Sequence, residues 1–419
     1  MVRDRPGSVS RVSIPDRLAD LVGVASPTGA EHDAVDLLAD WLGAGPADEV
    51  DRFTVPMAEM EDDPEYPGRE VERDEIPVVA ARKALGGPGP TVVLTGHVDT
   101  VEVGERSRWS RDPAGEADGD RLYGRGACDM KAGVVASLAA FEEIASHAEG
   151  RGGEIRFVAV PGEEDGGTGT LAAIRRGWGG DHVIVAEPTS AGSDPDVVIA
   201  HGGALTMTIE VEGRGAHGSV PGEGESALDH FYTVYRAMRQ VERDLNASVE
   251  HPQMRALPLP HATTVGVVRG GWWASNVMER LTAEARIGVP VGQTTAQAEE
   301  AFRDAVLRLT SEDPWLAEHP PGIALTGAAF GSSSIEPDHQ LVAAVVAAAA
   351  ETTGRTPVLR GAPYGCDMAL WRRVGGAAAL VYGPGDVALA HAADEWVSIA
   401  ETTAAAATLA EAARRLLSV

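Results

Sequence analysis

The sequence is poor in cysteine, in basic residues and in long apolar runs, and each shortage excludes a class of protein. Its 419 residues include two cysteines, Cys128 and Cys366, which are too few for a disulfide framework. Lysine and arginine number 35 against 63 acidic residues, and the formal charge of −28 disfavours nucleic acid and anionic membranes as partners. No apolar run approaches the ~20 residues of a membrane-spanning helix, so we expect no membrane partner.

We also expect no secretory leader. The N-terminal stretch "MVRDRPGSVSRVSIPDRL" has no apolar core and no cleavage signal, so we expect a cytoplasmic protein. What is present is a globular composition, with 44% hydrophobic and 23% charged residues. A chain of 419 residues exceeds one ordinary hydrophobic core, which predicts two domains.

Apolar strands alternate with helices in the first half of the sequence and again near its end. Strands are predicted at 91–96, 153–160, 181–186 and 377–383, and helices at 15–24, 31–45, 131–148, 171–178, 340–354 and 398–417. The predicted strands are apolar on both faces, which is typical of a parallel sheet buried between helices. The fold class predicted for these segments is therefore α/β, with a mostly parallel sheet covered by helices.

The residues between these segments follow a different order. Strands are predicted at 206–213, 263–271, 280–290 and 322–329, and amphipathic helices at 226–245 and 294–312. The order βαββαβ is that of a ferredoxin-like α+β unit. We therefore divide the chain into a discontinuous α/β domain, residues 1–203 and 331–419, and an inserted α+β domain at 204–330. The acidic stretch Glu59–Glu75 is predicted to be a solvated loop.

Polar side chains follow each predicted strand of the α/β domain, where ligands of open α/β sheets collect. A glycine-rich turn before a helix adds one more carboxylate. The residues concerned are His97, Asp99, Glu163, Glu164, Glu187, His391 and, in the turn, Asp129. Because the carboxyl ends of parallel strands meet at one edge of a sheet, these side chains are predicted to lie together.

This set of side chains predicts a metal site. Imidazole and carboxylate groups suit Zn²⁺ and its first-row neighbours, and no thiolate set for a structural site is present. Five groups (His97, Asp129, Glu164, Glu187 and His391) are enough for two ions if one carboxylate bridges them. Asp99 is placed to accept the second ring N–H of His97. Of the adjacent Glu163 and Glu164, one can bind metal while the other acts as general base toward a water.

Five motifs in this order resemble the M20 family of di-zinc aminohydrolases. They are "GHVDT", "GRGACDMKAG", "PGEEDGGTGT", "AEPT" and "PGD…AHAADEW", and they span most of the chain. The family includes acetylornithine deacetylase, succinyl-diaminopimelate desuccinylase, aminoacylase, carboxypeptidase and dipeptidase members. The sequence departs from the family pattern at Glu102, where a proline is usual, and at Gly365-Cys366-Asp367, where a Gly-Thr-Asp-like stretch is common.

The resemblance implies a role for each ligand. His97 and Glu187 would bind one metal ion, and Glu164 and His391 the other, with Asp129 as the bridge. Glu163 would be the general base that activates a metal-bridging hydroxide and later protonates the leaving amine. The ions would be Zn²⁺, with Co²⁺ or Mn²⁺ as alternatives.

The resemblance also implies roles for the inserted domain and for substrate-binding residues. The inserted domain would act as a lid and mediate a homodimer. His217 would reach the partner subunit's active site and stabilise the tetrahedral oxyanion. Asn276, Arg286 and Gly365 would hold the carboxylate of the substrate.

The donor set predicts a metal-dependent enzyme, and the resemblance implies a hydrolase of the amide bond of an N-acyl amino acid, with a small N-acyl amino acid or short peptide as substrate. A dipeptidase or carboxypeptidase of the same family would use the same residues. A non-catalytic binding protein of the same fold is a further alternative. A thiol hydrolase built on Cys128 or Cys366 is disfavoured, because the acidic residues around Cys128 would raise its pKa.

Overall fold

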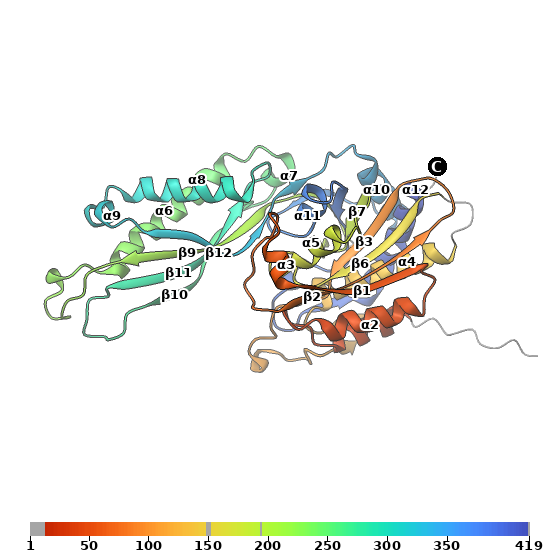
Figure 1. Ribbon diagram of the computed structural model, residues 1–419, viewed down its shortest axis with the longest axis horizontal. Coiled ribbons are helices and arrows are strands. Elements are labelled where there is room, and N and C mark those ends of the chain that lie inside the picture. Colours follow the sequence, from red (N-terminus) through yellow and green to blue (C-terminus); the bar gives the residue numbers. More distant parts are fainter. Residues whose placement is uncertain (1–12, 148–151, 193–194, 418–419) are drawn as a thin grey trace, which may run out of the picture.

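The computed structural model describes residues 13–147, 152–192 and 195–417, and it has two lobes (Figure 1). The N-terminal residues 1–12, where no leader is expected, lie outside this part of the chain. The larger lobe holds both chain segments of the predicted α/β domain, and the smaller one holds the inserted segment. None of the helices in the described ranges has the length and apolar character needed to cross a membrane.

A nine-stranded sheet forms the centre of the larger lobe. The strand order is β1-β2-β6-β3-β7-β15-β8-β13, and β14 pairs with β8. Neighbours among β6, β3, β7 and β15 are parallel, whereas β1, β2 and β13 join in antiparallel fashion. The strands are β1 (Glu49–Pro56), β2 (Glu75–Ala84), β3 (Thr91–His97), β6 (Glu154–Val160), β7 (His182–Val185), β8 (Val197–His201), β13 (Ser333–Ser334), β14 (Leu359–Ala362) and β15 (Ala378–Val381). The predicted mostly parallel sheet is confirmed.

Helices cover the sheet: α2 and α5 pack on β2, α4 and α12 on β3, and α10 on β15. Helices α1, α4, α10 and α12 pack on one another, and Arg17 of α1 stacks on Trp41 of α2. Helices α5 and α11 contact each other and lie in front of the sheet in Figure 1. The bounds are α1 (Ile14–Gly23), α2 (His32–Gly43), α4 (Ala132–Ser146), α5 (Thr168–Arg175), α10 (Gln340–Thr353), α11 (Met368–Arg373) and α12 (Ile399–Leu417).

The smaller lobe is an antiparallel four-stranded sheet with strand order β10-β11-β9-β12. The two long helices α6 and α8 pack on it and on each other, and a separate hydrophobic core lies between them and the sheet. The elements are β9 (Gly203–Glu212), α6 (Ala227–Ala247), β10 (Thr263–Gly270), β11 (Arg280–Val289), α8 (Thr295–Thr310), α9 (Pro314–Glu318) and β12 (Gly322–Phe330). The short helix α7 (Pro252–Arg255) of the inserted segment packs on β14 and β8 of the larger lobe. The order βαββαβ is as predicted, and we keep 204–330 as our proposal for the domain limits.

Two parts of the larger lobe differ from the sequence-based expectation. A small sheet of β4 (Glu116–Asp118), β5 (Arg121–Tyr123) and β16 (Trp396–Ser398) was not predicted. The expectation of a solvated loop at Glu59–Glu75 is wrong in part, because α3 (Met57–Glu61) begins just before it and Met60 and Arg73 are buried. Arg73 is buried because carboxylates from two other segments surround its guanidinium group.

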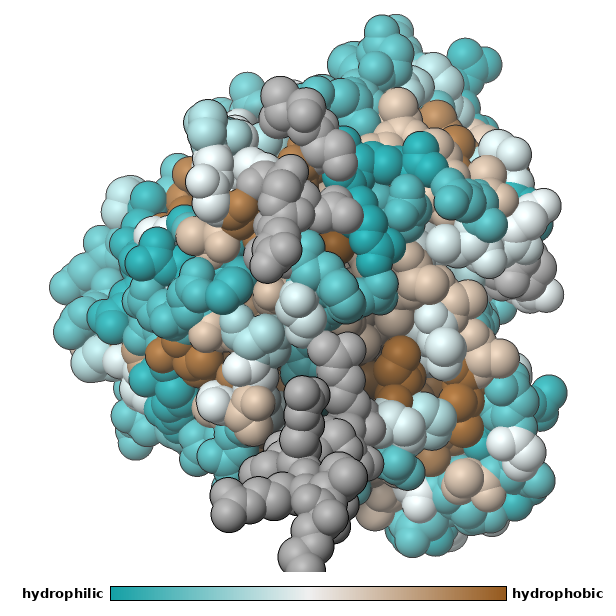
Figure 2. All heavy atoms as spheres, turned by 90° about the vertical axis from the view of Figure 1, so that its right-hand side faces the viewer, coloured by the Kyte–Doolittle hydropathy of each residue, from teal (hydrophilic) through white to brown (hydrophobic). Residues whose placement is uncertain are grey.

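The visible outer surface of the larger lobe is mostly hydrophilic (Figure 2). Figure 2 shows one end of the larger lobe, where hydrophilic residues cover most of the visible face and apolar residues form small separate groups.

Candidate metal centre

The predicted ligands lie at the carboxyl ends of the parallel strands. His97 is the last residue of β3, and Glu163 and Glu164 follow β6 after a short turn. Glu187 follows β7, and His391 lies in the segment after β15. Asp129 lies in the turn that leads into α4. These five segments come together because β6, β3, β7 and β15 are consecutive parallel neighbours in the sheet.

Two groups of three donors share Asp129. In the first, Nε2 of His97 lies 3.2 Å from Asp129 Oδ1 and 3.6 Å from Glu187 Oε1. In the second, Nε2 of His391 lies 3.0 Å from Glu164 Oε1 and 3.4 Å from Asp129 Oδ2. In each group the donor atoms lie within 4.8 Å of one another, so each group has the size of a metal site. Asp129 directs one oxygen to each group, as a bridging carboxylate would.

The donors fit divalent first-row ions such as Zn²⁺, since all are imidazole nitrogens or carboxylate oxygens. The Glu187 Oε1 atom is buried and has no hydrogen-bond partner among the described residues. A buried carboxylate oxygen without a partner is costly, and a cation would satisfy it. The residues present therefore fit the metal pair that the sequence predicts.

The protonation of these groups reflects crowded negative charge. Burial raises the pKa of Glu187 to about 8 and also raises the pKa of Glu164. Hydrogen bonds to Asp129 and Glu164 raise the pKa of His391 to about 10. Burial acts to raise the pKa of Asp129, but hydrogen bonds from His391 and His97 outweigh it and hold that pKa below its ordinary value. A bound cation would replace the protons that otherwise neutralise the carboxylates.

Glu163 lies beside the two donor groups without belonging to either. Its Oε2 atom is 4.0 Å from Nε2 of His97, and its side chain lines the cavity above the donors. Burial, followed by the charge of Glu187 and other nearby acids, raises the pKa of Glu163 well above its ordinary value. A carboxyl group with a raised pKa can accept a proton and hold it near neutral pH, which a general base and acid requires.

Asp99 holds the turn that carries both glutamates. Its Oδ1 accepts a hydrogen bond from the Glu163 N–H, and its Oδ2 accepts one from the Glu164 N–H, both at 3.1 Å. The ring Nδ1 of His97 lies 2.9 Å from the backbone carbonyl oxygen of Asp99 but 3.4 Å from its carboxylate. The predicted contact between His97 and Asp99 therefore exists mainly through the backbone, and the carboxylate of Asp99 supports the Glu163–Glu164 turn.

Several residues that the sequence did not single out support the site. Glu395 Oε1 accepts hydrogen bonds from the N–H groups of Cys128 and Asp129 at 2.9 and 3.1 Å, and its Oε2 accepts one from Arg125 at 2.5 Å. Asp367 is buried and accepts a hydrogen bond from Thr170 Oγ1 at 2.6 Å. The position of Glu395 four residues after His391, in the same motif, was the one available sequence signal.

A cavity of about 320 Å³ opens above the donors. It is lined by acids and His391 of the site together with Pro188, Val387, Tyr364, Gly365, Cys366 and Arg286. Arg286 donates to the Pro363 carbonyl oxygen at 3.3 Å, and burial lowers its pKa without a neighbouring carboxylate that opposes the shift. Arg286 and Gly365 therefore reach the cavity where the sequence-based interpretation puts the substrate.

His217 and Asn276 lie elsewhere in this chain. They form a β-bridge with each other in the inserted domain, and neither lines the cavity. The His217 ring contacts Ser219 Oγ at 2.7 Å and is exposed. Within one chain they do not meet the donor groups, so a role for them depends on a second copy.

The cysteines do not resemble nucleophiles. Cys128 and Cys366 are both buried, and burial raises the pKa of each thiol well above its ordinary value. A thiol nucleophile needs the opposite shift.

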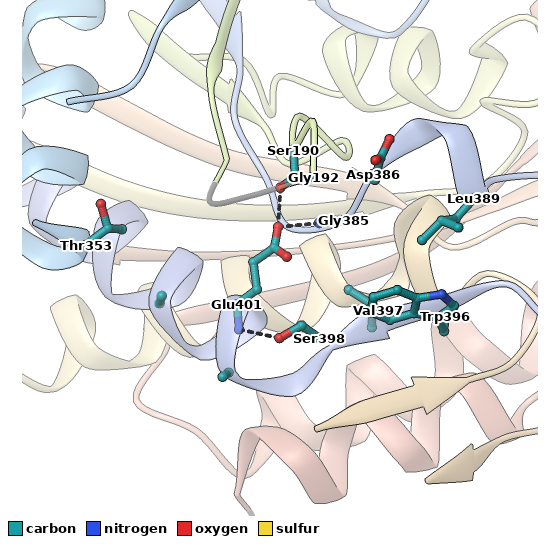
Figure 3. Close-up of a pocket in the computed structure, with 12 residues that line it drawn as sticks. Ser190, Gly192, Thr353, Gly385, Asp386, Leu389, Trp396, Val397, Ser398 and Glu401 are labelled. Carbon is teal, nitrogen blue, oxygen red and sulfur yellow. Dashed lines mark hydrogen bonds between the residues drawn. The ribbon is translucent and has the colours of Figure 1, made fainter. Parts of the chain in front are cut away.

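A second hollow, of about 640 Å³, is lined by residues of the segments 190–192 and 385–389 and of helix α12, among others (Figure 3). Glu401 of α12 points between Ser190 and Gly385 in this view. Its Oε1 accepts a hydrogen bond from the Gly385 N–H at 2.9 Å and one from Ser190 Oγ. Glu401 therefore ties together the loops that carry Glu187 and His391.

We expect Glu401→Ala to weaken metal binding about 10-fold or more, since residues that support ligands typically contribute 10- to 100-fold to metal affinity. Glu401→Gln keeps an acceptor oxygen and should lose less. Competition titration with a chromophoric chelator measures the affinity, and Glu411→Ala, farther along α12, is the control. Equal affinity in all four proteins would show that the Glu401 contacts do not support the ligands.

Taken together, a mostly parallel α/β sheet, an inserted α+β unit and two donor groups sharing one carboxylate define a candidate two-metal hydrolase. The model of peptidase family M20/M25/M40 matches residues 93–415, and the chain belongs to this family, whose members are metal-dependent hydrolases.

Among curated relatives, the chain is 27% identical over 328 residues to the N-formyl-4-amino-5-aminomethyl-2-methylpyrimidine deformylase of Bacillus subtilis, with 74% of this chain and 75% of that protein covered. It is 24% identical over 346 residues to a probable succinyl-diaminopimelate desuccinylase of Staphylococcus aureus, with 75% and 80% covered. The M20 family metallo-carboxypeptidase Sso-CP2 of Sulfolobus solfataricus has the same fold, with a TM-score of 0.73, 15% identity and coverage of 97% and 99%.

Proposed function

We propose that the protein hydrolyses the amide bond of a small N-acyl amino acid at a two-metal centre. Asp129 is the observation that carries this proposal, because its two oxygens face two separate groups of donors while the buried Glu163 lies beside them. His97 and Glu187 would hold one ion and Glu164 and His391 the other. We propose zinc, with cobalt or manganese as alternatives.

The residues of this chain divide the reaction between them. Bound ions would supply Lewis acidity toward the substrate carbonyl and a water of lowered pKa. Glu163 accepts a proton from the attacking water and delivers it to the nitrogen of the leaving amine. Arg286 binds the carboxylate of the amino acid, with Gly365 leaving room for the backbone approach. His217 of the partner subunit donates a hydrogen bond to the oxyanion.

The inserted domain is part of the proposal. Its separate core and its position beside the cavity suit a lid that closes over the substrate, and a homodimer would bring His217 and Asn276 to the other chain's site. A dipeptidase or carboxypeptidase would use the same groups. The names of the two curated relatives, a deformylase and a desuccinylase, favour removal of an acyl group.

A substrate panel tests this proposal. We expect the zinc-, cobalt- or manganese-loaded protein to hydrolyse N-formyl, N-acetyl or N-succinyl amino acids at least 10-fold faster, in kcat/KM, than dipeptides. Faster hydrolysis of dipeptides would favour the peptidase alternative, and no hydrolysis of any member would overturn the proposal.

Arg286→Met tests how the substrate is held. Arg286 lines the cavity without a carboxylate partner among the described residues, and a charge-assisted hydrogen bond contributes about 1.5–3 kcal/mol. We therefore expect KM for an N-acyl amino acid to rise roughly 10- to 100-fold with kcat less affected. The matching N-acyl amino amide, which has no carboxylate, is the control, and an equal rise in its KM would contradict the assignment.

A further inference from the structure

A buried charged cluster lies next to the Glu163–Glu164 turn. The guanidinium group of Arg73 donates to Glu31 Oε1 at 3.0 Å and to Asp165 Oδ2 at 3.2 Å. The exposed fraction is 2% for the Arg73 side chain, 2% for Glu31 and 4% for Asp165. Arg73 belongs to the acidic stretch expected to be solvated, so neither its burial nor its partners follow from the sequence pattern.

This cluster connects three segments that are far apart in the chain. Asp165 Oδ1 accepts hydrogen bonds from the N–H groups of Glu70 and Val71, and Glu31 Oε1 accepts one from the Gly29 N–H at 2.8 Å. Next to Gly29, the Thr28 hydroxyl donates to Asp99 Oδ2 at 3.2 Å. Arg73 is therefore the link between the turn at 28–31, the stretch at 70–73 and the Glu163–Asp165 turn.

The guanidinium group also packs against the turn itself. A Cβ atom built on Gly162 would lie 2.9 Å from Nη1 of Arg73, and Gly162 has a φ of +69°. Gly162 immediately precedes Glu163, and its carbonyl oxygen accepts a hydrogen bond from the Gly167 N–H at 2.7 Å, which closes the turn. The backbone that sets the direction of the Glu163 side chain therefore packs directly against the guanidinium group of Arg73.

Two features make an arginine necessary here. Glu31 and Asp165 lie on different segments, and one planar guanidinium group reaches both with separate N–H groups, which the single ammonium of lysine cannot reproduce in the same geometry. Loss of the cation would leave two buried carboxylates without their ion-pair partner, and such groups move apart or take up protons. Either response would displace the turn.

We propose that Arg73 is a positioning residue for the reaction, holding the Glu163–Glu164 turn so that the Glu163 carboxylate faces the cavity; this inference rests on the proposed function. It acts through Asp165, Gly162 and the backbone of Glu163, and it touches neither substrate nor metal. Its loss lowers kcat more than it raises KM, because the proton transfer requires Glu163 at the correct distance whereas Arg286 binds the substrate independently.

The test compares Arg73→Lys and Arg73→Ala with Arg17→Met in the metal-loaded full-length protein. Arg17 is a matched control, since it makes two hydrogen bonds to the buried Glu142, at 2.9 and 3.0 Å, away from the cavity. A displacement of about 1 Å can cost about 100-fold in rate. We expect each Arg73 variant to lose 10- to 100-fold in kcat, with KM changed less than threefold and metal content unchanged. Arg17→Met should lower the melting temperature and leave kcat unchanged.

Chemical rescue distinguishes a positioning role of Arg73 from an effect on the stability of the protein. Millimolar guanidinium ion, added to Arg73→Ala, should restore part of kcat, whereas the same concentration of sodium ion should not. If Arg73→Ala does not fold, the lysine variant still decides the matter, because it keeps the charge. If the wild type is active and Arg73→Lys has the same kcat, the positioning role of Arg73 is wrong while the proposed function stands. A wild-type protein with no amide hydrolase activity would overturn the proposed function and the inference with it.

Discussion

Glu163→Gln is expected to lower kcat about 10³-fold while both metal positions stay filled. General acid–base catalysis typically contributes 10²- to 10⁴-fold, and Glu163 is the carboxylate that lines the cavity without belonging to either donor group. Glutamine has the same shape, and the two hydrogen bonds that Asp99 accepts come from backbone N–H groups, which the substitution leaves in place. Steady-state kinetics with the best substrate of the panel, together with elemental analysis, measure the two quantities.

Glu102→Gln provides the control, since the exposed Glu102, in the segment after β3, belongs to neither donor group and does not line the cavity. Its kcat should equal that of the wild type. If Glu163→Gln kept kcat within 10-fold, another group would have to move the proton. If the variant lost metal instead, Glu163 would be a ligand, and its assignment as base would be wrong.

Asp129→Asn is expected to abolish detectable turnover and to reduce the metal content to one ion or none. Each donor group has three members, and Asp129 is the member that the two share. An asparagine offers one oxygen and an NH₂ group, so at least one donor group is left with two ligands. Because five protein donors serve two ions, neither group can replace the lost oxygen.

Thermal unfolding gives a second readout for Asp129. A metal ion that binds the folded state alone stabilises it by about 2.7 kcal/mol at 100 times its Kd. Added zinc should therefore raise the melting temperature of the wild type and have less effect on Asp129→Asn. The buried carboxylate of Asp196, which pairs with Arg355 away from the site, is the control: Asp196→Asn should lose stability but bind two ions. Two tightly bound ions in Asp129→Asn would refute the bridging assignment.

The regular part of the fold was predictable from the sequence. Long apolar strands such as β3 and β6, and the alternation of 206–213, carry their periodicity over several residues. The three-residue strands β4, β5 and β16 are too short to show a period, and they form a sheet because segments far apart in the chain meet. The burial of Arg73 was unpredictable for a related reason, because its two carboxylate partners come from other parts of the chain.

The candidate site was likewise predictable where it depends on the strand order and unpredictable where it depends on contacts between distant segments. The proximity of His97, Glu187 and His391 followed from one topological rule, since each comes after a parallel strand. The sequence did not reveal which atoms meet. Asp99 was expected to bind the His97 ring through its carboxylate, but that carboxylate lies 3.4 Å from the ring nitrogen and mainly accepts two backbone N–H groups. A hydrogen bond to backbone leaves no mark on residue type, so this contact of Asp99 was not visible in the motifs.

The two histidines differ sharply in their access to solvent, since the His97 side chain is 1% exposed and that of His391 is 51% exposed. An ion held by His391 and Glu164 would therefore be more accessible to water and chelators than one held by His97 and Glu187. The ion beside His391 would be the first to be removed by a chelator. Partial dialysis against a chelator, followed by addition of a different metal, would then yield a protein with two different ions. The added metal would occupy the position beside His391.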